Sequence, residues 1–307
     1  MIVVVCPGQG SQTPGFLAPW LELDGARERI EAYSQAAEVD IALHGVHSDA
    51  AVIRDTSIAQ PLIVAASLLA WRVLHDRLAS GAVDGVAGHS VGELAALAAA
   101  GVLTDEDAMR LVGLRGRAMA HAAAFEITGM SAVVGGVEDE VLARIDNLAL
   151  TAANRNGAGQ IVAAGGIGQL DLLRQDPPAK ARVIPLPVAG AFHTAYMEPA
   201  VERLRHAAAG LATADPAITL WTNRDGSVVT SGRTALDLLV GQVASPVRWD
   251  LCMQSFAEHG VTGIVELAPA GTLVGLAKRA LKDVPAVAVR TPDDLDDAVA
   301  LVAGDRS

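Results

Sequence analysis

The sequence is poor in cysteine, in aromatic residues and in positive charge. Cys6 and Cys252 are the two cysteines of a 307-residue chain, too few for a disulfide framework, which indicates a reducing compartment. Aromatic residues make up 3% of the chain and hydrophobic residues 51%, so alanine, valine and leucine must fill most of a core. The chain has 35 Asp and Glu but 23 Lys and Arg, which gives a formal net charge of −12. This balance argues against a nucleic-acid partner, which requires a basic surface.

Signals for export, membrane insertion and metal binding are also missing. The N-terminus has no basic segment before its apolar residues and so does not read as a signal peptide. No uninterrupted apolar run is long enough to cross a bilayer, and the nearest candidate is Leu94 to Leu103. No spacing of cysteine and histidine is typical of a metal site. We therefore expect a cytoplasmic protein with no membrane segment and no metal.

The chain begins with a buried strand and a glycine-rich loop. Met1 to Cys6 is a continuous run rich in β-branched residues, typical of a parallel strand covered on both faces. The loop Pro7 to Gln12 follows, and α/β folds place ligands at the carboxyl ends of such strands. It is not a P-loop, because no Gly-Lys-Ser/Thr follows. The length allows one large α/β domain, or a large domain with a small insert.

The segment Gly88-His89-Ser90-Val91-Gly92 matches the G-x-S-x-G nucleophile elbow. Apolar residues before it indicate a short strand, and the alanine-rich run after it indicates a helix that ends near Gly101. In such a turn the serine occupies the sharp bend, and the flanking glycines leave room for it. The pattern alone is weak evidence, since a glycine turn before an ordinary helix gives the same letters. Its strand and helix context favours Ser90 as a nucleophile.

The remaining elements follow the alternation of an α/β fold. Helices are expected over 26–43, over 58–79 with its start near Gln60 and Pro61, and from Thr104, as N-cap, to Ala124. After residue 190 we expect helices over 198–209, 234–243, 249–259, 273–282 and 292–302, and strands over 261–267 and 287–289. Residues 218–222 and 228–229 should form a hairpin around Asp225-Gly226.

Between these parts the pattern changes. Strands are expected over 130–134, 148–153, 160–164 and 182–188, with helices over 138–145 and 170–175. This β-α-β-β-α-β order is that of a ferredoxin-like unit. We interpret it as a small subdomain inserted into the larger one, overhanging the Ser90 side.

A serine nucleophile needs a base, and His193 is the best candidate among the eight histidines. It follows a predicted strand and precedes a predicted helix, whereas His89 should point away from the neighbouring serine. An α/β-hydrolase also needs an acid between serine and histidine in chain order. No Asp or Glu between positions 90 and 193 follows a strand end convincingly. The residues thus favour a Ser-His dyad, its imidazole oriented by a carbonyl, over an ordinary esterase.

A series of motifs resembles, in the same order, the malonyl-CoA:acyl carrier protein transacylases of bacterial type II fatty acid synthesis and, beyond them, the acyltransferase domains of polyketide synthases. They are Pro7-Gly8-Gln9-Gly10-Ser11-Gln12, Gln60-Pro61, Gly88 to Glu93, Arg115-Gly116, Gly129-Met130, Asn154-x-Asn156-x-x-Gly159-Gln160 and Ala191-Phe192-His193. The resemblance covers essentially the whole chain. It implies an α/β-hydrolase-like core with a parallel sheet, residues 1–125 and 190–307, and a ferredoxin-like subdomain, residues 126–189.

The resemblance also implies roles for individual residues. Ser90 would be the nucleophile, His193 the general base, and Gln242 the residue whose carbonyl orients the imidazole. The remaining implied residues form the oxyanion hole (backbone N–H groups of Gln9 and Val91), the site for the malonyl carboxylate (Arg115), the acyl pocket (Gln60 and Met130), the space beside the acyl α-carbon (Phe192) and the approach of CoA (Asn154 and Asn156). A purely structural interpretation competes for four of these residues. In that interpretation Gln60 lies at a helix start, Met130 fills the core, and Asn154 and Asn156 belong to a turn. One departure is Gly190, where many malonyl-specific polyketide acyltransferases carry histidine.

The reaction implied is ping-pong transfer of a malonyl group from malonyl-CoA to the phosphopantetheine thiol of acyl carrier protein, with no bound cofactor. We expect a monomer. Carrier proteins of this kind are acidic, so docking needs a local basic patch, for which Lys278, Arg279 and Lys282 are candidates. The alternatives are a malonyltransferase subunit serving malonate decarboxylase, a stand-alone serine hydrolase, and a catalytically silent acyl-binding scaffold.

Overall fold

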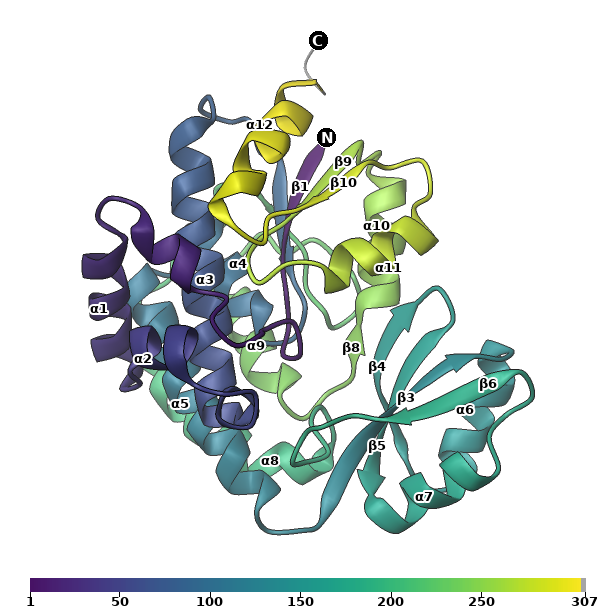
Figure 1. The fold of residues 1–307 in the computed structure, drawn as a ribbon. Helices are drawn as coiled ribbons and strands as arrows, with labels where there is room; N and C mark the ends of the chain where they lie inside the picture. Colours follow the sequence, from purple (N-terminus) through teal and green to yellow (C-terminus); the bar gives the residue numbers. More distant parts are fainter. Residues whose placement is uncertain (305–307) are drawn as a thin grey trace.

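The computed structural model describes residues 1–304 as an α/β protein with two five-stranded sheets (Figure 1). The first sheet is parallel and has the strand order β10-β9-β1-β2-β7. Its strands are β1 (Ile2–Cys6), β2 (Gly85–Gly88), β7 (Thr219–Leu220), β9 (Gly263–Glu266) and β10 (Ala286–Ala288). Cys6 at the end of β1 pairs with Gly88 at the end of β2, so the loops that follow these strands lie side by side.

The central strand β1 explains the apolar run at the start of the chain. Ile2, Val4 and Cys6 belong to the large hydrophobic core, whereas Val3 and Val5 belong to a second core. The two sets alternate because successive side chains of a strand point to opposite faces. Helices cover both faces, so every residue of β1 is buried, as the sequence predicts.

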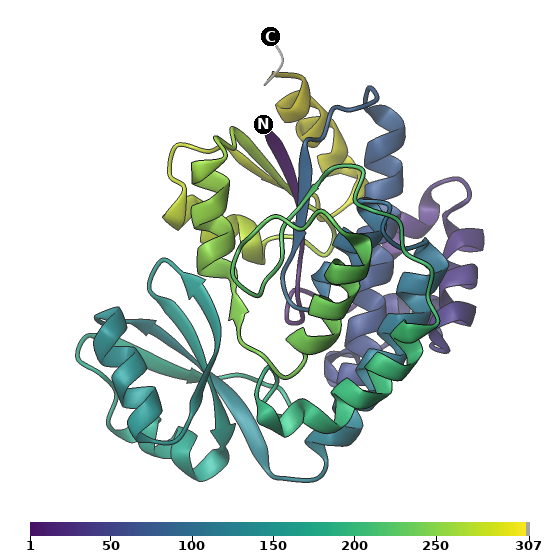
Figure 2. The same ribbon diagram turned by 180° about the vertical axis from the view of Figure 1, so that it is seen from behind.

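Helices surround the parallel sheet on both sides. They are α1 (Ala26–Ala37), α2 (Ile41–His47), α3 (Thr56–Arg77), α4 (Gly92–Ala99), α5 (Asp105–Ala123), α8 (Glu198–Ala209), α9 (Gly232–Gln242), α10 (Trp249–Glu258), α11 (Thr272–Ala280) and α12 (Leu295–Gly304), with short 3₁₀ turns at Ala18–Glu22, Val52–Arg54, Ala195–Met197 and Pro292–Asp294. Helices α10 and α11 pack on the face that carries Val3 and Val5. Seen from behind, α8 and α9 lie in front of α5 and α4 (Figure 2).

The second sheet has the order β6-β3-β5-β4-β8. Its elements are β3 (Thr128–Gly135), α6 (Glu138–Asn147), β4 (Thr151–Gly157), β5 (Gln160–Gly166), α7 (Ile167–Gln175), β6 (Ala181–Pro185) and β8 (Val247–Arg248). The β-α-β-β-α-β order of its first six elements is the order predicted. Helices α6 and α7 pack on one face, while Met130 and Ala153 from the sheet join the large core. Strand β8 lies much later in the chain, between α9 and α10, and pairs in parallel with β4. This pairing connects the second sheet to the helices around the first sheet (Figure 1).

Two predicted helix boundaries are wrong. The helix expected over 26–43 is two helices, because Glu38 adopts a left-handed conformation, with φ of 57°, and Asp40 then caps α2 by accepting from the Leu43 N–H. Helix α3 begins at Thr56, four residues before Gln60, because the Asp55 side chain caps it. Pro61 therefore lies inside the helix instead of in its first turn.

The predicted hairpin around Asp225-Gly226 is reduced to a single antiparallel bridge between Trp221 and Val228. The main partner of β7 is β2, with which it pairs in parallel. Trp221 accounts for this preference, since its ring packs over Gly85 of β2 and its indole N–H donates to Ser255 at 3.0 Å.

Helix α3 is long and apolar enough to cross a membrane by length and composition, which corrects the choice of Leu94 to Leu103 as nearest candidate. Its most apolar stretch is, however, 78% buried inside the protein. A buried core helix passes the same test of length and composition, so this helix is weak evidence for a membrane span.

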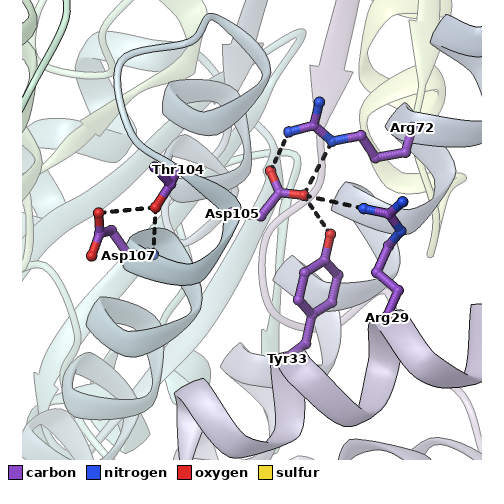
Figure 3. A network of polar contacts seen from close by, with 6 residues as sticks. All are labelled: Arg29, Tyr33, Arg72, Thr104, Asp105 and Asp107. Atoms are coloured by element: carbon purple, nitrogen blue, oxygen red, sulfur yellow. Dashed lines mark hydrogen bonds and ion pairs between the residues drawn. The ribbon is translucent and has the colours of Figure 1, made fainter.

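A polar network fixes the relative positions of α1, α3 and α5 (Figure 3). Asp105 at the start of α5 accepts from the Tyr33 hydroxyl at 2.6 Å and from Arg72 at 2.6 and 3.1 Å, with Arg29 at 4.0 Å. The neighbouring Thr104 caps α5, as predicted, by accepting from the Asp107 N–H. Helices α3 and α5 carry Gln60 and Arg115. The network therefore fixes the relative positions of the two helices on which these predicted site residues lie.

Candidate active site

The turn between β2 and α4 places Ser90 at a sharp bend. Ser90 has φ of 54°, a left-handed conformation that serine adopts only under constraint. A Cβ on Gly88 would lie 2.1 Å from the carbonyl carbon of Gly92, and one on Gly92 would lie 2.2 Å from the Cys6 carbonyl oxygen. Both glycines are therefore required by close backbone approach. The predicted strand, turn and helix are confirmed.

Ser90 and His193, 103 residues apart in sequence, meet directly. The Ser90 hydroxyl lies 2.7 Å from His193 Nε2, and His193 Nδ1 lies 2.8 Å from the backbone carbonyl of Gln242. A carbonyl can only accept, so Nδ1 carries the proton and Nε2 is free to accept from the serine. Burial and the nearby Arg115 charge lower the His193 pKa to about 3, which keeps the imidazole neutral at neutral pH.

Tertiary contacts hold His193 in this position. Its backbone N–H donates to the Val243 carbonyl at 3.1 Å. Ahead of it, the Ala191 N–H donates to the Thr128 hydroxyl, and the Thr194 hydroxyl donates to the Ala191 carbonyl. The loop that carries the histidine is thus bound to β3 of the second sheet and to the segment between α9 and β8.

Arg115 lies on α5 but is only 1% exposed. Its Nη1 donates to Gln60 Oε1 at 2.7 Å and its Nη2 donates to Gln242 Oε1 at 2.9 Å. Within residues 1–304 it forms no ion pair with a carboxylate, and its buried Nε has no hydrogen-bond partner. Burial lowers the Arg115 pKa to about 10, so it remains a cation. A buried guanidinium with a free donor is suited to a carboxylate ligand.

Two backbone N–H groups in the loops after β1 and β2 have no partner within residues 1–304. Gln9 follows β1 and Val91 follows the serine, and neither N–H donates a hydrogen bond within the described part of the chain. The Gln9 side chain donates instead to the Arg54 carbonyl at 3.3 Å and the Thr56 hydroxyl at 3.4 Å, which fixes the loop. Such free donors at the ends of neighbouring strands can stabilise an oxyanion.

Phe192, which precedes His193 in the chain, and Met130 are both buried apolar residues. Each is 6% exposed and both belong to the large hydrophobic core. Gln60 Nε2 contacts Met119 Sδ at 3.4 Å on the side of Arg115. A Cβ on Gly190 would lie 2.6 Å from Ala123 Cβ, so the histidine found here in many polyketide acyltransferases would not fit this chain without movement.

The two asparagines of β4 differ in their surroundings. Asn156 Oδ1 lies 2.9 Å from His89 Nε2, and Asn156 Nδ2 donates to Gln160 Oε1 at 3.2 Å. His89 therefore points away from Ser90, as predicted, and links the elbow to the second sheet. Asn154 Oδ1 is buried and has no partner among the described residues.

Comparison with known proteins agrees with this geometry. The family described as "Acyl transferase domain" matches residues 3–301. The chain belongs to this family. It is 57% identical over 298 residues to the malonyl CoA-acyl carrier protein transacylase of Mycobacterium tuberculosis strain H37Rv, covering 97% of this chain and 99% of that protein.

Solved structures of this acyl transferase family superpose closely. The crystal structure of MCAT from Mycobacterium tuberculosis has a TM-score of 0.95 at 56% identity, covering 97% of this chain and 99% of that one. A type II PKS acyl-carrier protein in complex with its malonyl-transacylase contains a chain with a TM-score of 0.90 at 29% identity, with the same coverage. The similarity thus extends over the whole acyl transferase.

Sequence reasoning missed two polar residues of this acyl transferase site. Asn223 Oδ1 accepts from the Ser90 N–H at 2.7 Å, and Asn223 Nδ2 donates to the Gly88 carbonyl. Glu93, 3% exposed, accepts from the Asn223 N–H and from Gln242 Nε2. Burial raises the Glu93 pKa to about 7. Glu93 was visible only as the last letter of the elbow motif, and Asn223 only as the residue before a predicted turn.

Proposed function

We propose that this chain transfers the malonyl group of malonyl-CoA to the phosphopantetheine thiol of acyl carrier protein through a malonyl ester on Ser90. The observation that carries this proposal is the hydrogen-bonded series from Ser90 through His193 to the Gln242 carbonyl, joined by the Gln242 side chain to the buried Arg115. The serine and histidine can carry out acyl transfer, and the buried arginine can bind a carboxylate on the acyl group.

In the first half-reaction, Ser90 Oγ attacks the thioester carbonyl while His193 Nε2 takes the hydroxyl proton. The N–H groups of Gln9 and Val91 stabilise the resulting oxyanion. The C–S bond then breaks, His193 returns the proton to the CoA sulfur, and the malonyl ester of Ser90 remains. Because the Gln242 carbonyl holds the imidazole by Nδ1, no carboxylate is needed to orient it.

In the second half-reaction the carrier thiol gives its proton to His193 and its sulfur attacks the ester. The C–O bond to Ser90 breaks, the serine regains the proton, and malonyl-carrier protein leaves. Arg115 binds the malonyl carboxylate in both half-reactions, Gln60, Met130 and Phe192 line the acyl site, and the free Asn154 Oδ1 accepts from an amide of pantetheine. Asn156 acts indirectly, by holding β4 against His89.

We also propose that residues 1–125 and 190–304 form an α/β-hydrolase-like core and that residues 126–189 form a ferredoxin-like subdomain; the predicted extension of the core to residue 307 lies outside the described residues. The parallel sheet, the elbow after β2 and the β-α-β-β-α-β order support this division. In the proposed arrangement a monomer acts in the cytoplasm, with the acyl site between these parts.

Release of CoA with and without carrier protein tests the proposed function. A transferase should release about one equivalent of CoA per enzyme from malonyl-CoA alone, and multiple turnovers should require holo-carrier protein. Apo-carrier protein, which lacks the thiol, is the matched control. Steady CoA release without carrier protein would indicate a hydrolase, and no release at all would indicate a silent scaffold.

Phe192 is expected to exclude acyl groups branched at the α-carbon. Phe192→Ser should raise kcat/KM for methylmalonyl-CoA by about 10-fold or more, because the space of a ring is far larger than one methyl group. The preference for a carboxylate over acetyl should remain. Phe125→Ser, which changes a ring that is 64% exposed, is the control. Unchanged methylmalonyl transfer in a folded Phe192→Ser enzyme would remove Phe192 from the acyl site.

The basic patch at the end of α11 should bind the carrier protein. Lys278, Arg279 and Lys282 are all exposed, so replacing them with glutamate should leave the fold intact. We expect the KM for carrier protein to rise about 10-fold, with the KM for malonyl-CoA unchanged. Charge reversal of Arg203 and Arg205 on α8 is the control. Equal effects on both substrates would argue against this docking surface.

A further inference from the structure

Glu93 is a buried carboxyl beside the nucleophile that the proposed reaction does not use. It is the second residue of α4 and is 3% exposed. Its Oε1 accepts from the backbone N–H of Asn223 and its Oε2 accepts from Gln242 Nε2. Burial of a carboxyl is costly unless hydrogen bonds compensate for the lost water, so the contacts of Glu93 need an explanation.

The two residues that Glu93 binds hold the backbone of Ser90 on both sides. Asn223 Oδ1 accepts from the Ser90 N–H at 2.7 Å, and Gln242 Nε2 donates to the Ser90 carbonyl at 3.0 Å. Asn223 Nδ2 also donates to the Gly88 carbonyl at 2.5 Å. Ser90 keeps φ of 54°, a conformation that costs on the order of 1–3 kcal/mol and persists only where surrounding contacts fix it.

The donors around Glu93 require a carboxylate. An ionised carboxyl accepts at both oxygens, whereas an amide of the same shape accepts at one end and donates at the other. The Asn223 N–H belongs to the backbone and cannot become an acceptor. A glutamine at position 93 would therefore point its own NH₂ group at another donor, either the Asn223 N–H or Gln242 Nε2. The second clash could be relieved only if the Gln242 amide flipped to present its oxygen.

Turning over Gln242 would disturb Arg115 as well. Gln242 Oε1 accepts from Arg115 Nη2 at 2.9 Å while Gln242 Nε2 faces Glu93. The amide thus lies between a buried cation and a buried anion, with its acceptor toward the first and its donor toward the second. The negative charge of Glu93 helps to keep Arg115 protonated.

We propose that Glu93 is a positioning residue whose carboxylate fixes the amide groups of Asn223 and Gln242, and through them the backbone of Ser90 and the guanidinium of Arg115. The Arg115 part rests on the proposed function. The Ser90 part does not, because it concerns the reactivity of the serine toward any acylating or sulfonylating reagent.

The test compares wild type with Glu93→Gln, using malonyl-CoA and phenylmethanesulfonyl fluoride as separate reagents. The sulfonyl fluoride forms an S–O bond to Ser90 Oγ as S–F breaks, the serine proton passes to His193, and fluoride leaves. It has no carboxylate and so does not use Arg115. Displacing Ser90 by about 1 Å should slow both reactions by about 10²-fold.

Glu266→Gln is the matched control. Glu266 is also buried, and its oxygens accept from the backbone N–H groups of Gly271, Leu273 and Val274. Its replacement removes a buried carboxylate without touching the contacts of Ser90, so sulfonylation should proceed at nearly the wild-type rate. If Glu93→Gln does not fold, Asn223→Ala, which removes the acceptor for the Ser90 N–H, should slow sulfonylation in the same way.

The pH dependence separates positioning by a carboxylate from a general loss of structure. With a Glu93 pKa of about 7, wild-type sulfonylation should fall as the pH decreases through this value, because a proton on Glu93 removes an acceptor. Among the groups that face Glu93, Arg115 of α5 stays charged and Cys252 of α10 stays a thiol, since burial lowers the Arg115 pKa only to about 10 and raises the Cys252 pKa. His193 and His89 have lowered pKa values and stay neutral. Glu93→Gln should be slow and flat across this range.

Each result bears on the proposal. Slow sulfonylation and malonylation of folded Glu93→Gln, with the pH step lost, support it. Wild-type sulfonylation rates in Glu93→Gln, or rates lowered no more than in Glu266→Gln, overturn it. A wild-type enzyme that reacts with the sulfonyl fluoride but not with malonyl-CoA would contradict the proposed function, while the sulfonyl fluoride comparison would still decide the role of Glu93.

Discussion

Ser90→Ala should abolish malonyl transfer to carrier protein, with a loss on the order of 10⁶-fold, comparable to removing the nucleophile of a serine protease. The alanine has no oxygen to carry the ester, although His193 and the two N–H donors remain in place. The measurement is the rate of malonyl-carrier protein formation at saturating substrates. Ser67 offers a control, because its buried hydroxyl donates to the Ala268 carbonyl and lies outside the site. The Ser67→Ala variant should therefore remain active. Transfer at more than a few per cent of the wild-type rate by Ser90→Ala would require another nucleophile.

Arg115→Ala should change which acyl group the enzyme accepts. With malonyl-CoA, kcat/KM should fall by about 2–5 kcal/mol of transition-state stabilisation, the cost of removing one partner of a buried charge pair. With acetyl-CoA it should change little or improve, because acetyl has no carboxylate. Arg115→Lys should recover only part of the malonyl rate, since an ammonium cannot form the bidentate pair. The measurement is kcat/KM for both thioesters.

Arg117 provides a matched control on the same helix. It is half-exposed and binds the Ala37 carbonyl and the Glu38 carboxylate, away from Gln60 and Gln242. Arg117→Ala should leave the ratio of malonyl to acetyl transfer unchanged. If Arg115→Ala lowers transfer of both acyl groups equally, Arg115 supports the structure of the site and the carboxylate binds elsewhere.

Local sequence patterns predicted the elements that lie next to one another in the chain. The apolar run Met1 to Cys6 is typical of a strand covered on both faces, and the glycines around Ser90 favour a tight turn. The β-α-β-β-α-β order of β3 to β6 was also predicted from the sequence. The break at Glu38 was not, because a glutamate in a left-handed conformation carries no signal in the sequence.

The polar support of the site could not be predicted from local patterns. An arginine on a helix normally faces solvent, and only the packing of α3, α9 and α5 buries Arg115 against Gln60 and Gln242. Asn223 and Glu93 lie 130 residues apart in sequence. Their pairing depends on β7 lying beside β2, which in turn depends on where Trp221 packs. Family resemblance indicated Gln242 and the residues expected to touch the substrate, but it assigned no role to Glu93 or Asn223.

The most direct test of the account is the intact mass of the enzyme during one catalytic cycle. After mixing with malonyl-CoA, the wild-type mass should increase by one malonyl group, with peptide mapping placing it on Ser90. Holo-carrier protein should then remove that group from the enzyme and gain it in equal amount. Malonyl-carrier protein that forms with no acyl-enzyme, or an adduct on Ser90 that carrier protein cannot discharge, would contradict the proposed transfer.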